Sequence, residues 1–223
     1  SLFSLPLAAA VARLQREQAL WRRWWLALWL ALVTHPLLDA MTVYGTQLAL
    51  PFSNHPFGVG SIFIVDPLYT LPLLIGVGAA LVARGSARGW RLNLAGLVLS
   101  TAYLGWSVIA QQHVRSVALA SLQAQGIATD QVLVTPSPLN TVLWRIVAMD
   151  GERYHEGFYS LLDATAEIRF DAFDRGRALA ETYADAPGLR RIASFSHGFY
   201  KLQLSDGRLL LSDLRMGQEP SYL

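Results

Sequence analysis

Almost all the long apolar segments of this chain lie in its first half, and that half contains very few acidic residues. Between Ser1 and Thr129 the only acidic side chains are Glu17, Asp39 and Asp66. An apolar stretch of about 20 residues is long enough to cross a bilayer as a helix. The first half therefore predicts an integral membrane protein, with Asp39 and Asp66 in or beside its apolar segments.

The composition supports a division into a membrane half and a water-exposed half. Hydrophobic residues make up 53% of the 223 residues, and charged residues only 15%. After about residue 123 the sequence becomes polar, charged and rich in turn signals. We therefore predict a transmembrane helical domain over residues 1–123 and a small extramembrane α+β domain over residues 124–223.

Four apolar segments predict the helices of the membrane domain. Residues 1–14 are too short to span alone, so we interpret them as the second half of a membrane helix that begins further upstream. Residues 24–41, 68–82 and 92–109 predict further spans, and the last continues as an amphipathic stem. The predicted fold is an α-helical integral membrane bundle with about three full spans and a partial N-terminal one.

The positions of the arginines predict the orientation of these helices. Arginines cluster in the connections at residues 13–23 and 84–91, and residues 43–65 contain no arginine or lysine. Basic residues are concentrated in the cytoplasmic loops of membrane proteins. We therefore expect the 43–65 loop and the C-terminal domain to face the extracytoplasmic side of the bacterial inner (plasma) membrane.

The second half of the chain predicts a small domain of strands and short helices. The predicted strands are 142–149, 154–162 and 168–173, the helices 176–184 and 187–192, and the hairpin 199–211. Asp-Gly pairs at 150–151 and 206–207 are turn signals between neighbouring strands. Residues 135–138 contain two prolines and predict a linker or a sheet edge. Because the turn signals are self-contained, we expect residues 129–223 to fold alone.

Composition and motifs exclude several kinds of site. With no cysteine, the chain has no disulfide, thiolate nucleophile or cysteine-ligated zinc. The formal net charge of +2 and the lack of a dense basic cluster outside the helix connections argue against a nucleic-acid partner. No Walker A, GxSxG, HExxH or dinucleotide-binding glycine motif is present. Metal chemistry would therefore depend on histidines and carboxylates.

His35 and Asp39 lie near the end of an apolar segment at a spacing of four residues. On a helix this spacing places both side chains on one face, within reach of a shared ligand. Ionisable groups at membrane depth are functional candidates. The spacing leaves two interpretations open: a metal or catalytic pair, and a polar pair that holds two helices together.

Asp66 precedes Pro67 at the start of the next apolar segment. An aspartate N-cap followed by proline is an ordinary way to begin a helix. Contact with a metal is the second interpretation, and the sequence leaves both open. His113, His155 and His197 are scattered, and no carboxylate recurs near them at ligand spacing.

Two stretches, THPLLDAMTVYGTQLALPFS and IFIVDPLYTLPLL, carry a resemblance to a known family. They resemble the membrane-bound metal-dependent hydrolases, a group of bacterial inner-membrane proteins with LexA-regulated members. The shared residues are His35, Asp39, Tyr44-Gly45-Thr46, Pro51-Phe52 and Asp66-Pro67. The resemblance implies a metal site that uses His35 and Asp39 with Asp66 nearby. It also implies further ligands from an upstream acidic stretch before Ser1.

These observations predict an integral membrane hydrolase whose metal-activated water attacks an ester or phosphoester of a lipid or envelope component. Its catalytic residues and metal ligands would be His35, Asp39 and Asp66. Histidine with carboxylates suits Zn²⁺, and an oxygen-richer shell favours Mn²⁺ or Mg²⁺. The expected partners are membrane lipids and the substrate itself. The alternative is a non-enzymatic membrane protein whose extramembrane domain binds a partner.

Overall fold

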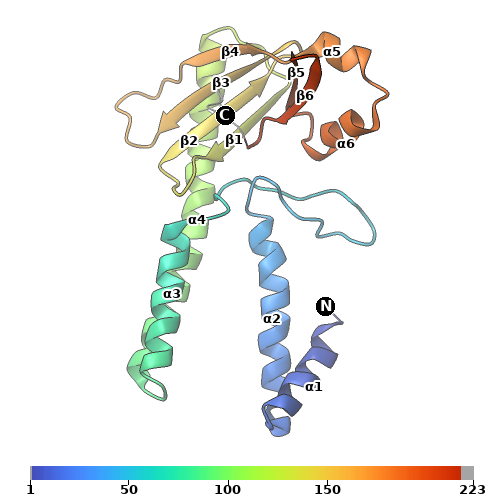
Figure 1. The fold of residues 1–223 in the computed structure, drawn as a ribbon. Helices are drawn as coiled ribbons and strands as arrows, with labels where there is room; N and C mark the ends of the chain where they lie inside the picture. Colours follow the sequence, from blue (N-terminus) through green and yellow to red (C-terminus); the bar gives the residue numbers. More distant parts are fainter. Residues whose placement is uncertain (1, 217–223) are drawn as a thin grey trace. The chain divides into compact units, whose positions relative to one another are not determined.

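The computed structural model describes residues 2–216 (Figure 1). Contacts between residues divide the chain into two units, Ser1–Val59 and Gly60–Leu223, which we call the N-terminal unit and the C-terminal unit. The N-terminal unit consists of helices and a loop. The C-terminal unit begins with two helices, followed by a four-stranded sheet, two short helices and a two-stranded hairpin.

The N-terminal unit begins with two helices and the turn between them: α1 (Ser4–Leu14), η1 (Gln18–Leu20) and α2 (Trp21–Asp39). Ser4, Ala8 and Ala12 are buried at a spacing of four residues, so one face of small side chains on α1 lies against α2. Trp25 Nε1 of α2 donates a hydrogen bond to Ser4 Oγ at 3.1 Å. The two helices thus meet through small residues, while leucines of both remain exposed.

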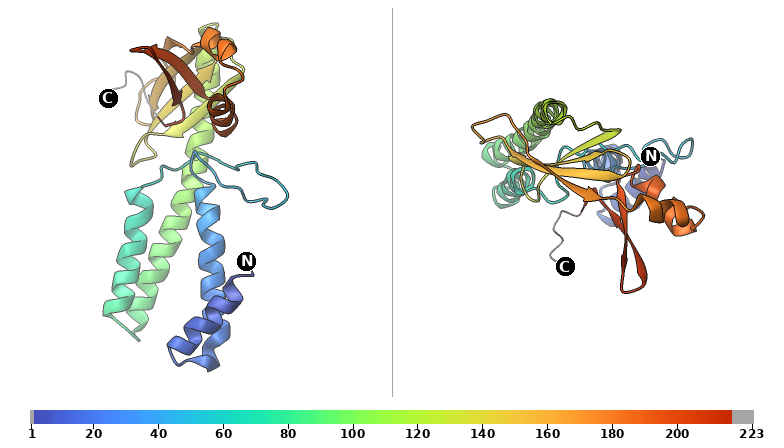
Figure 2. Two further views of the ribbon diagram at one scale, coloured as in Figure 1. Left: turned by 45° about the vertical axis from the view of Figure 1, so that its right-hand side comes forward. Right: turned by 90° about the horizontal axis from the view of Figure 1, so that it is seen from above.

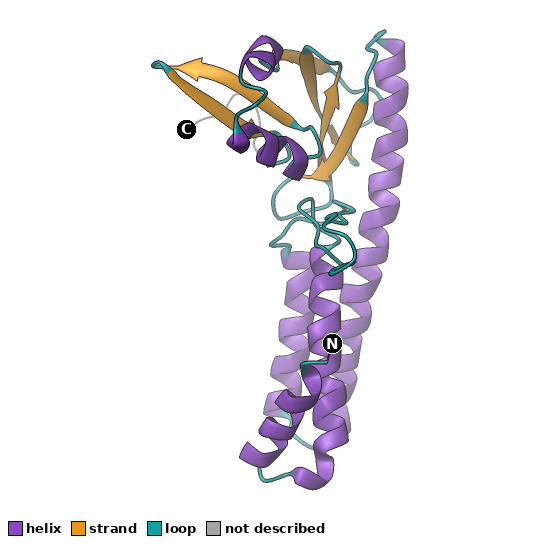
Figure 3. Ribbon diagram, turned by 90° about the vertical axis from the view of Figure 1, so that its right-hand side faces the viewer, coloured by secondary structure: helices purple, strands orange, loops and turns teal. Residues whose placement is uncertain are grey.

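The C-terminal unit begins with α3 (Pro67–Val82) and α4 (Ala87–Ala124), which lie side by side (Figures 1 and 3). Two glycines allow the close approach. A Cβ atom on Gly96 would lie 2.2 Å from the carbonyl oxygen of Pro72, and one on Gly76 would lie 3.0 Å from Asn93 Cα. Any side chain at Gly96 would therefore push α3 and α4 apart.

Strands fill the rest of the C-terminal unit. The sheet contains β1 (Gln131–Pro136), β2 (Leu143–Met149), β3 (Arg153–Ser160) and β4 (Phe170–Asp174), all antiparallel and in that order. After β4 come α5 (Arg177–Thr182), α6 (Pro187–Phe195), β5 (Tyr200–Ser205) and β6 (Arg208–Asp213). β5 and β6 form a separate hairpin that projects beside the sheet (Figure 2).

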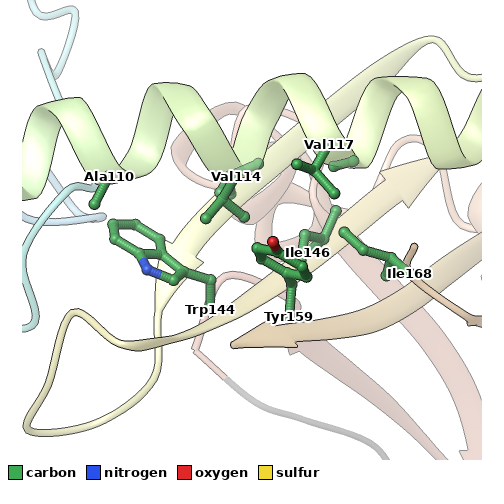
Figure 4. Close-up of a cluster of buried hydrophobic side chains, with 9 residues drawn as sticks. Ala110, Val114, Val117, Trp144, Ile146, Tyr159 and Ile168 are labelled. Atoms are coloured by element: carbon green, nitrogen blue, oxygen red, sulfur yellow. The ribbon is translucent and has the colours of Figure 1, made fainter. Parts of the chain in front are cut away.

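The main hydrophobic core lies between the second half of α4 and one face of the sheet (Figure 4). From α4, Ala110 and Val114 face the ring of Trp144 on β2. Trp144 is 0% exposed, and its Nε1 donates to the carbonyl oxygen of Thr141 at 2.9 Å. The remaining buried members of this core are Val117, Ala118, Val134, Ile146, Tyr159 and Ile168. The second half of α4 is therefore a core helix of the sheet domain.

The first half of α4 has a different surface. At 1.5 Å per residue its 38 residues extend roughly 57 Å, longer than the ~30 Å hydrocarbon core of a bilayer. Leu97, Val98 and Leu99 are more than half exposed, whereas Val114 is fully buried. A single continuous helix therefore carries an apolar outward-facing segment and a segment packed in a water-exposed domain.

The predicted bundle with about three full spans is wrong. Among the described helices, only α4 is long and apolar enough to cross a membrane. The 16 residues of α3 and the 11 residues of α1 fall short of the ~20 that a span needs. α2 has 19 residues, but it begins with Arg22 and Arg23 in its first turn and ends with His35, Pro36 and Asp39. With these polar residues at both ends, the mean hydropathy of α2 is too low for a membrane span.

The predicted strands agree more closely with the structure. Three of them lie close to β2, β3 and β4, the predicted hairpin is β5–β6, and both Asp-Gly pairs occur at turns. β1 was missed over residues 131–134 because the neighbouring prolines favoured a linker. Pro136 ends β1 at the edge of the sheet, where a missing N–H group is tolerated. The predicted boundary between residues 123 and 124 stays a prediction.

The shared core changes the expectation that residues 129–223 fold alone. Without α4 this fragment would expose the Trp144 face of the sheet to water, whereas a 108–223 fragment keeps Ala110 and Val114. Trp144 is the only tryptophan in either fragment, so its fluorescence reports this face directly. We expect blue-shifted emission and cooperative unfolding for 108–223, and red-shifted emission for 129–223. Equal emission and equal unfolding of the two fragments would contradict the shared core.

Candidate functional site

His35 and Asp39 form a close pair at the end of α2. His35 Nε2 and Asp39 Oδ2 lie 3.5 Å apart, at the helical spacing of four residues. The side chains are 77% and 48% exposed. The structure therefore brings together two of the three predicted site residues and leaves both accessible to a shared ligand.

The backbone after Asp39 is held by a compact set of hydrogen bonds. Thr42 Oγ1 and Thr42 N both donate to the carbonyl oxygen of Asp39, at 2.7 and 3.0 Å. Thr46 and Phe57 exchange two backbone hydrogen bonds of 2.9 Å, which close the following loop. Gly45 has φ +69°, and a Cβ atom there would lie 2.4 Å from the carbonyl oxygen of Phe57. The Tyr44-Gly45-Thr46 segment therefore shapes the chain beside the pair.

Asp66 lies in the C-terminal unit and caps the N-terminus of α3. Its Oδ1 accepts hydrogen bonds from the backbone N–H groups of Leu68 and Tyr69, at 2.9 and 3.4 Å. Its Oδ2 accepts from the hydroxyl of Tyr103 at 2.8 Å, and the residue is only 2% exposed. The N-cap interpretation of Asp66 is thus confirmed. Its role as a metal ligand stays a prediction.

Tyr103, which the sequence reasoning missed, connects three segments of the C-terminal unit. Its hydroxyl donates to Asp66, so its oxygen accepts from the hydroxyl of Thr141, which lies 3.0 Å away in the β1–β2 connection. Tyr103 thereby joins the start of α3, the middle of α4 and the edge of the sheet.

Tyr103 belongs to a row of polar residues on one face of α4, which we call the polar stripe: Ser100, Tyr103, Ser107 and Gln111. Ser100 Oγ donates to the carbonyl oxygen of Tyr69 at 2.7 Å, and Gln111 Nε2 donates to that of Val134 at 2.9 Å. Ser107 Oγ lies 3.1 Å from Ser61 Oγ. Spacings of three and four residues inside an apolar helix were the signal that could have identified the stripe from the sequence.

A second polar group lies in the sheet. Arg145 of β2 and Glu156 of β3 form a buried ion pair, and Arg145 Nη1 donates to the carbonyl oxygen of Leu214 at 2.6 Å. Burial, helped by the charge of Glu156, raises the pKa of Tyr154 to about 12. Burial lowers the pKa of Lys201, against the opposing charge of Glu156. The bond to Leu214 ties the segment after β6 to the sheet.

His155 also has a carboxylate partner that the sequence reasoning did not identify. His155 Nε2 lies 2.8 Å from Asp150 Oδ2 across the β2–β3 turn. Burial opposes ionisation of Asp150, but the hydrogen bonds from His155 and from the backbone of Arg153 outweigh it and lower the pKa of Asp150. The pair spans a tight turn, so its spacing of five residues gave no helical signal.

The surface of the C-terminal unit has two neighbouring grooves around α5. Their volumes are about 750 and 420 Å³, and both are lined by Arg177 and Glu181. Arg177 Nε and Glu181 Oε1 form an ion pair at 3.0 Å. Arg175 lies 4.8 Å from the centre of the Tyr200 ring and lines the smaller groove with it. The larger groove also contains Glu152 and Asp174, so its walls carry charges of both signs.

The donor set at His35 and Asp39 fits part of a metal site. An imidazole nitrogen and a carboxylate oxygen are both ligands that Zn²⁺ accepts. A catalytic zinc takes three protein ligands and a water. Among residues 2–216, the structure contains no group of three or more histidine and carboxylate side chains placed to share an ion. The pair therefore fits as two ligands of a divalent ion.

The long apolar helix α4 and the exposed leucines of the other helices are features that a membrane protein would show. The model of the family described as YdjM inner membrane protein matches residues 1–114. Because this match covers more than half of the chain, the chain belongs to the YdjM inner membrane protein family. The predicted inner-membrane location is thereby confirmed. No curated protein and no solved structure gives a match to the chain.

The family match covers the helical part of the chain and ends within α4. It supports the bacterial inner-membrane family that the resemblance implied, and it assigns no hydrolase activity and no metal. The inner-membrane location implied by the resemblance is therefore confirmed. The hydrolase activity and the metal stay predictions.

The Asp66–Tyr103 contact predicts energetic coupling between α3 and α4. A hydrogen bond to a charged group contributes about 1.5–3 kcal/mol, and loss of an N-cap costs about 1 kcal/mol. We expect Asp66→Ala and Tyr103→Phe each to lower the free energy of unfolding. In the double variant we expect an interaction energy of about 1–3 kcal/mol, because both changes remove the same bond.

This coupling can be measured by reversible unfolding in detergent micelles. Tyr69→Phe is the matched control, because the hydroxyl of Tyr69 makes no hydrogen bond within the described part of the chain. The control should leave the free energy of unfolding nearly unchanged. Additive losses in the Asp66→Ala and Tyr103→Phe double variant would show that the contact is absent in solution.

Proposed function

We propose that this protein is a metal-dependent hydrolase of the inner membrane and that His35 and Asp39 hold its ion. The observation that carries the proposal is the exposed pair at the end of α2, with Nε2 and Oδ2 3.5 Å apart. Two good metal donors on one helix face, accessible from outside, suit a site that must admit both an ion and a substrate.

In this proposal each residue of the site has a separate task. His35 supplies an imidazole nitrogen and Asp39 a carboxylate oxygen. Thr42 holds the last turn of α2 through the carbonyl oxygen of Asp39, which limits the movement of both ligands. A bound divalent ion would lower the pKa of a water and polarise a carbonyl or phosphoryl oxygen. Zn²⁺ suits this mixed donor set, and additional oxygen ligands would favour Mn²⁺ or Mg²⁺.

The substrate class follows from the location. The pair lies on an apolar helix of an inner membrane protein, so an ester or phosphoester of a lipid or of an envelope component is the substrate we propose. A catalytic zinc would need at least one further protein ligand beside the pair.

For Asp66 two roles can be separated by one substitution. Asp66→Asn removes the negative charge but keeps an oxygen that can cap α3. If Asp66 is a ligand, the variant should lose metal; if it acts only as the N-cap, the variant should keep it. The contacts with Leu68, Tyr69 and Tyr103 support the second outcome.

The metal assignment is tested by the metal content of the protein, purified without chelators and measured by mass spectrometry. We expect a stoichiometric divalent ion in the wild type and its loss in His35→Ala and in Asp39→Ala. His55→Ala is the matched control, since His55 is another exposed histidine of the N-terminal unit. Equal metal content in wild type and His35→Ala would remove the basis of the hydrolase proposal.

We also propose that the sheet domain faces the extracytoplasmic side. The support is α4 itself, because Arg84, Arg88 and Arg91 cluster at its N-terminal end and the sheet follows its C-terminal end. Basic flanks favour the cytoplasm. Alkaline phosphatase fused after Leu223 should be active, and green fluorescent protein fused there should stay dark.

The same two reporters inserted after Gly85 provide the control for this orientation. At that position we expect the opposite pattern, with a fluorescent protein that folds in the cytoplasm and an inactive phosphatase. Fluorescence from the fusion after Leu223 would reverse the proposed orientation.

A second candidate function is binding of a partner by the sheet domain without catalysis. The observation in its favour is the pair of grooves around Arg177 and Glu181, whose walls carry both charges. Wild-type protein that retains no metal but binds a ligand sensitive to Arg177→Ala would favour this function over the hydrolase.

A further inference from the structure

The loop between α2 and α3 contains an ordered segment, residues 46–57, which we call the apolar loop. The two backbone hydrogen bonds between Thr46 and Phe57 close it. Inside it, Gln47 Nε2 donates to the carbonyl oxygen of Asn54 at 3.0 Å. The N–H groups of Phe52 and Ser53 both donate to the carbonyl oxygen of Ala49, at 2.8 and 3.0 Å. The loop therefore satisfies much of its own backbone at its tip.

The apolar loop exposes several large apolar side chains. Phe52 is 94% exposed, Leu50 53% and Leu48 45%. Residues 43–65 contain no charged side chain. In Figure 2 the loop extends as an arm away from the end of α2. An ordered arm that exposes large apolar side chains and no charge needs an apolar environment.

We propose that the apolar loop inserts its tip, around Leu50 and Phe52, into the lipid–water interface of the inner membrane. The loop lies within the region that matches the inner membrane family. It follows α2 in the chain after six intervening residues, and leucines of α2 are themselves exposed. Lipid offers no hydrogen-bond partner for a free backbone N–H or C=O group. The hydrogen bonds within the loop pair several of these groups, as insertion into the membrane interface requires.

A lipid surface fits the loop better than a protein partner does. Protein interfaces combine an apolar centre with a rim of polar and charged groups that fix the orientation of the partner. The apolar loop has no Asp, Glu, Lys or Arg for such a rim, and its exposed Asn54 and His55 suit the headgroup level of a bilayer. The loop begins close to Asp39 in the chain, so its insertion would hold the His35–Asp39 pair near the lipid headgroups. The inference does not depend on a metal at that pair.

Because the chain has no cysteine, a single introduced cysteine can be labelled specifically. The experiment uses the full chain in lipid nanodiscs that hold one copy each, with Phe52→Cys carrying a polarity-sensitive nitrobenzoxadiazole label. Leu162→Cys is the matched control: Leu162 is 84% exposed in the β3–β4 connection but has charged neighbours such as Asp163. Neither substitution touches the bonds that close the apolar loop.

We expect the label at position 52 to emit further to the blue than the label at position 162. Lipids with a nitroxide near the headgroup should quench the label at 52 several-fold more strongly, and aqueous iodide should quench it several-fold less. Adding Leu50→Asp to the Phe52→Cys protein should restore iodide access.

Two results would overturn the proposal. In the first, the label at 52 is as accessible to iodide as the label at 162 and is not quenched by nitroxide lipids. In the second, the label is protected only when two copies share a nanodisc, which would assign the loop to a contact between copies of this chain.

Discussion

The packing of α4 against the sheet is the interaction on which the C-terminal unit depends. Val114 and Ala110 fill the space beside Trp144, and the buried side chains of three strands close around them. The same helix, some four turns earlier, presents exposed leucines and passes the length and hydropathy required of a membrane span. The N-terminal half of α4 must therefore present apolar side chains to lipid, and its C-terminal half must pack in a protein core. The helix is continuous between the two.

The polar stripe explains how one helix can serve both environments. Ser100, Tyr103, Ser107 and Gln111 use their side chains to bind backbone and side-chain groups of α3, the preceding loop and β1. Each of these groups would be costly if it were buried without a partner. Asp66 gains most from this arrangement, because its carboxylate is almost fully buried yet accepts hydrogen bonds from α3 and from Tyr103.

The proposed chemistry lies in the other unit, at the end of α2. His35 and Asp39 are held by a helix end that Thr42 stabilises, and the apolar loop follows within a few residues. Our two proposals, a metal at this pair and insertion of the apolar loop, together place the hydrolase site beside lipid-like substrates. The family match supports the membrane location and leaves the reaction to be established.

Sequence reasoning succeeded where the signal was local. Alternating strands and two Asp-Gly turns identified β2, β3 and the β5–β6 hairpin, and helical spacing identified the contact between His35 and Asp39. It failed where the answer depended on a whole segment or on distant residues. The apolar residues 24–41 predicted a span, but the helix also includes Arg22 and Arg23, which lower its mean hydropathy below that of a membrane span. Tyr103 was missed because its partners, Asp66 and Thr141, lie 37 and 38 residues away.

The central claim is that α4 is one unbroken helix shared by the membrane and the sheet domain. The most direct measurement is the distance between spin labels on cysteines introduced at Leu97 and Leu119, both exposed on α4, in lipid nanodiscs. Twenty-two residues of continuous helix separate the two backbone positions by roughly 33 Å. The account predicts a single narrow distribution near that value. A short or broad distribution would show that α4 bends or breaks between the membrane and the sheet, and would contradict it.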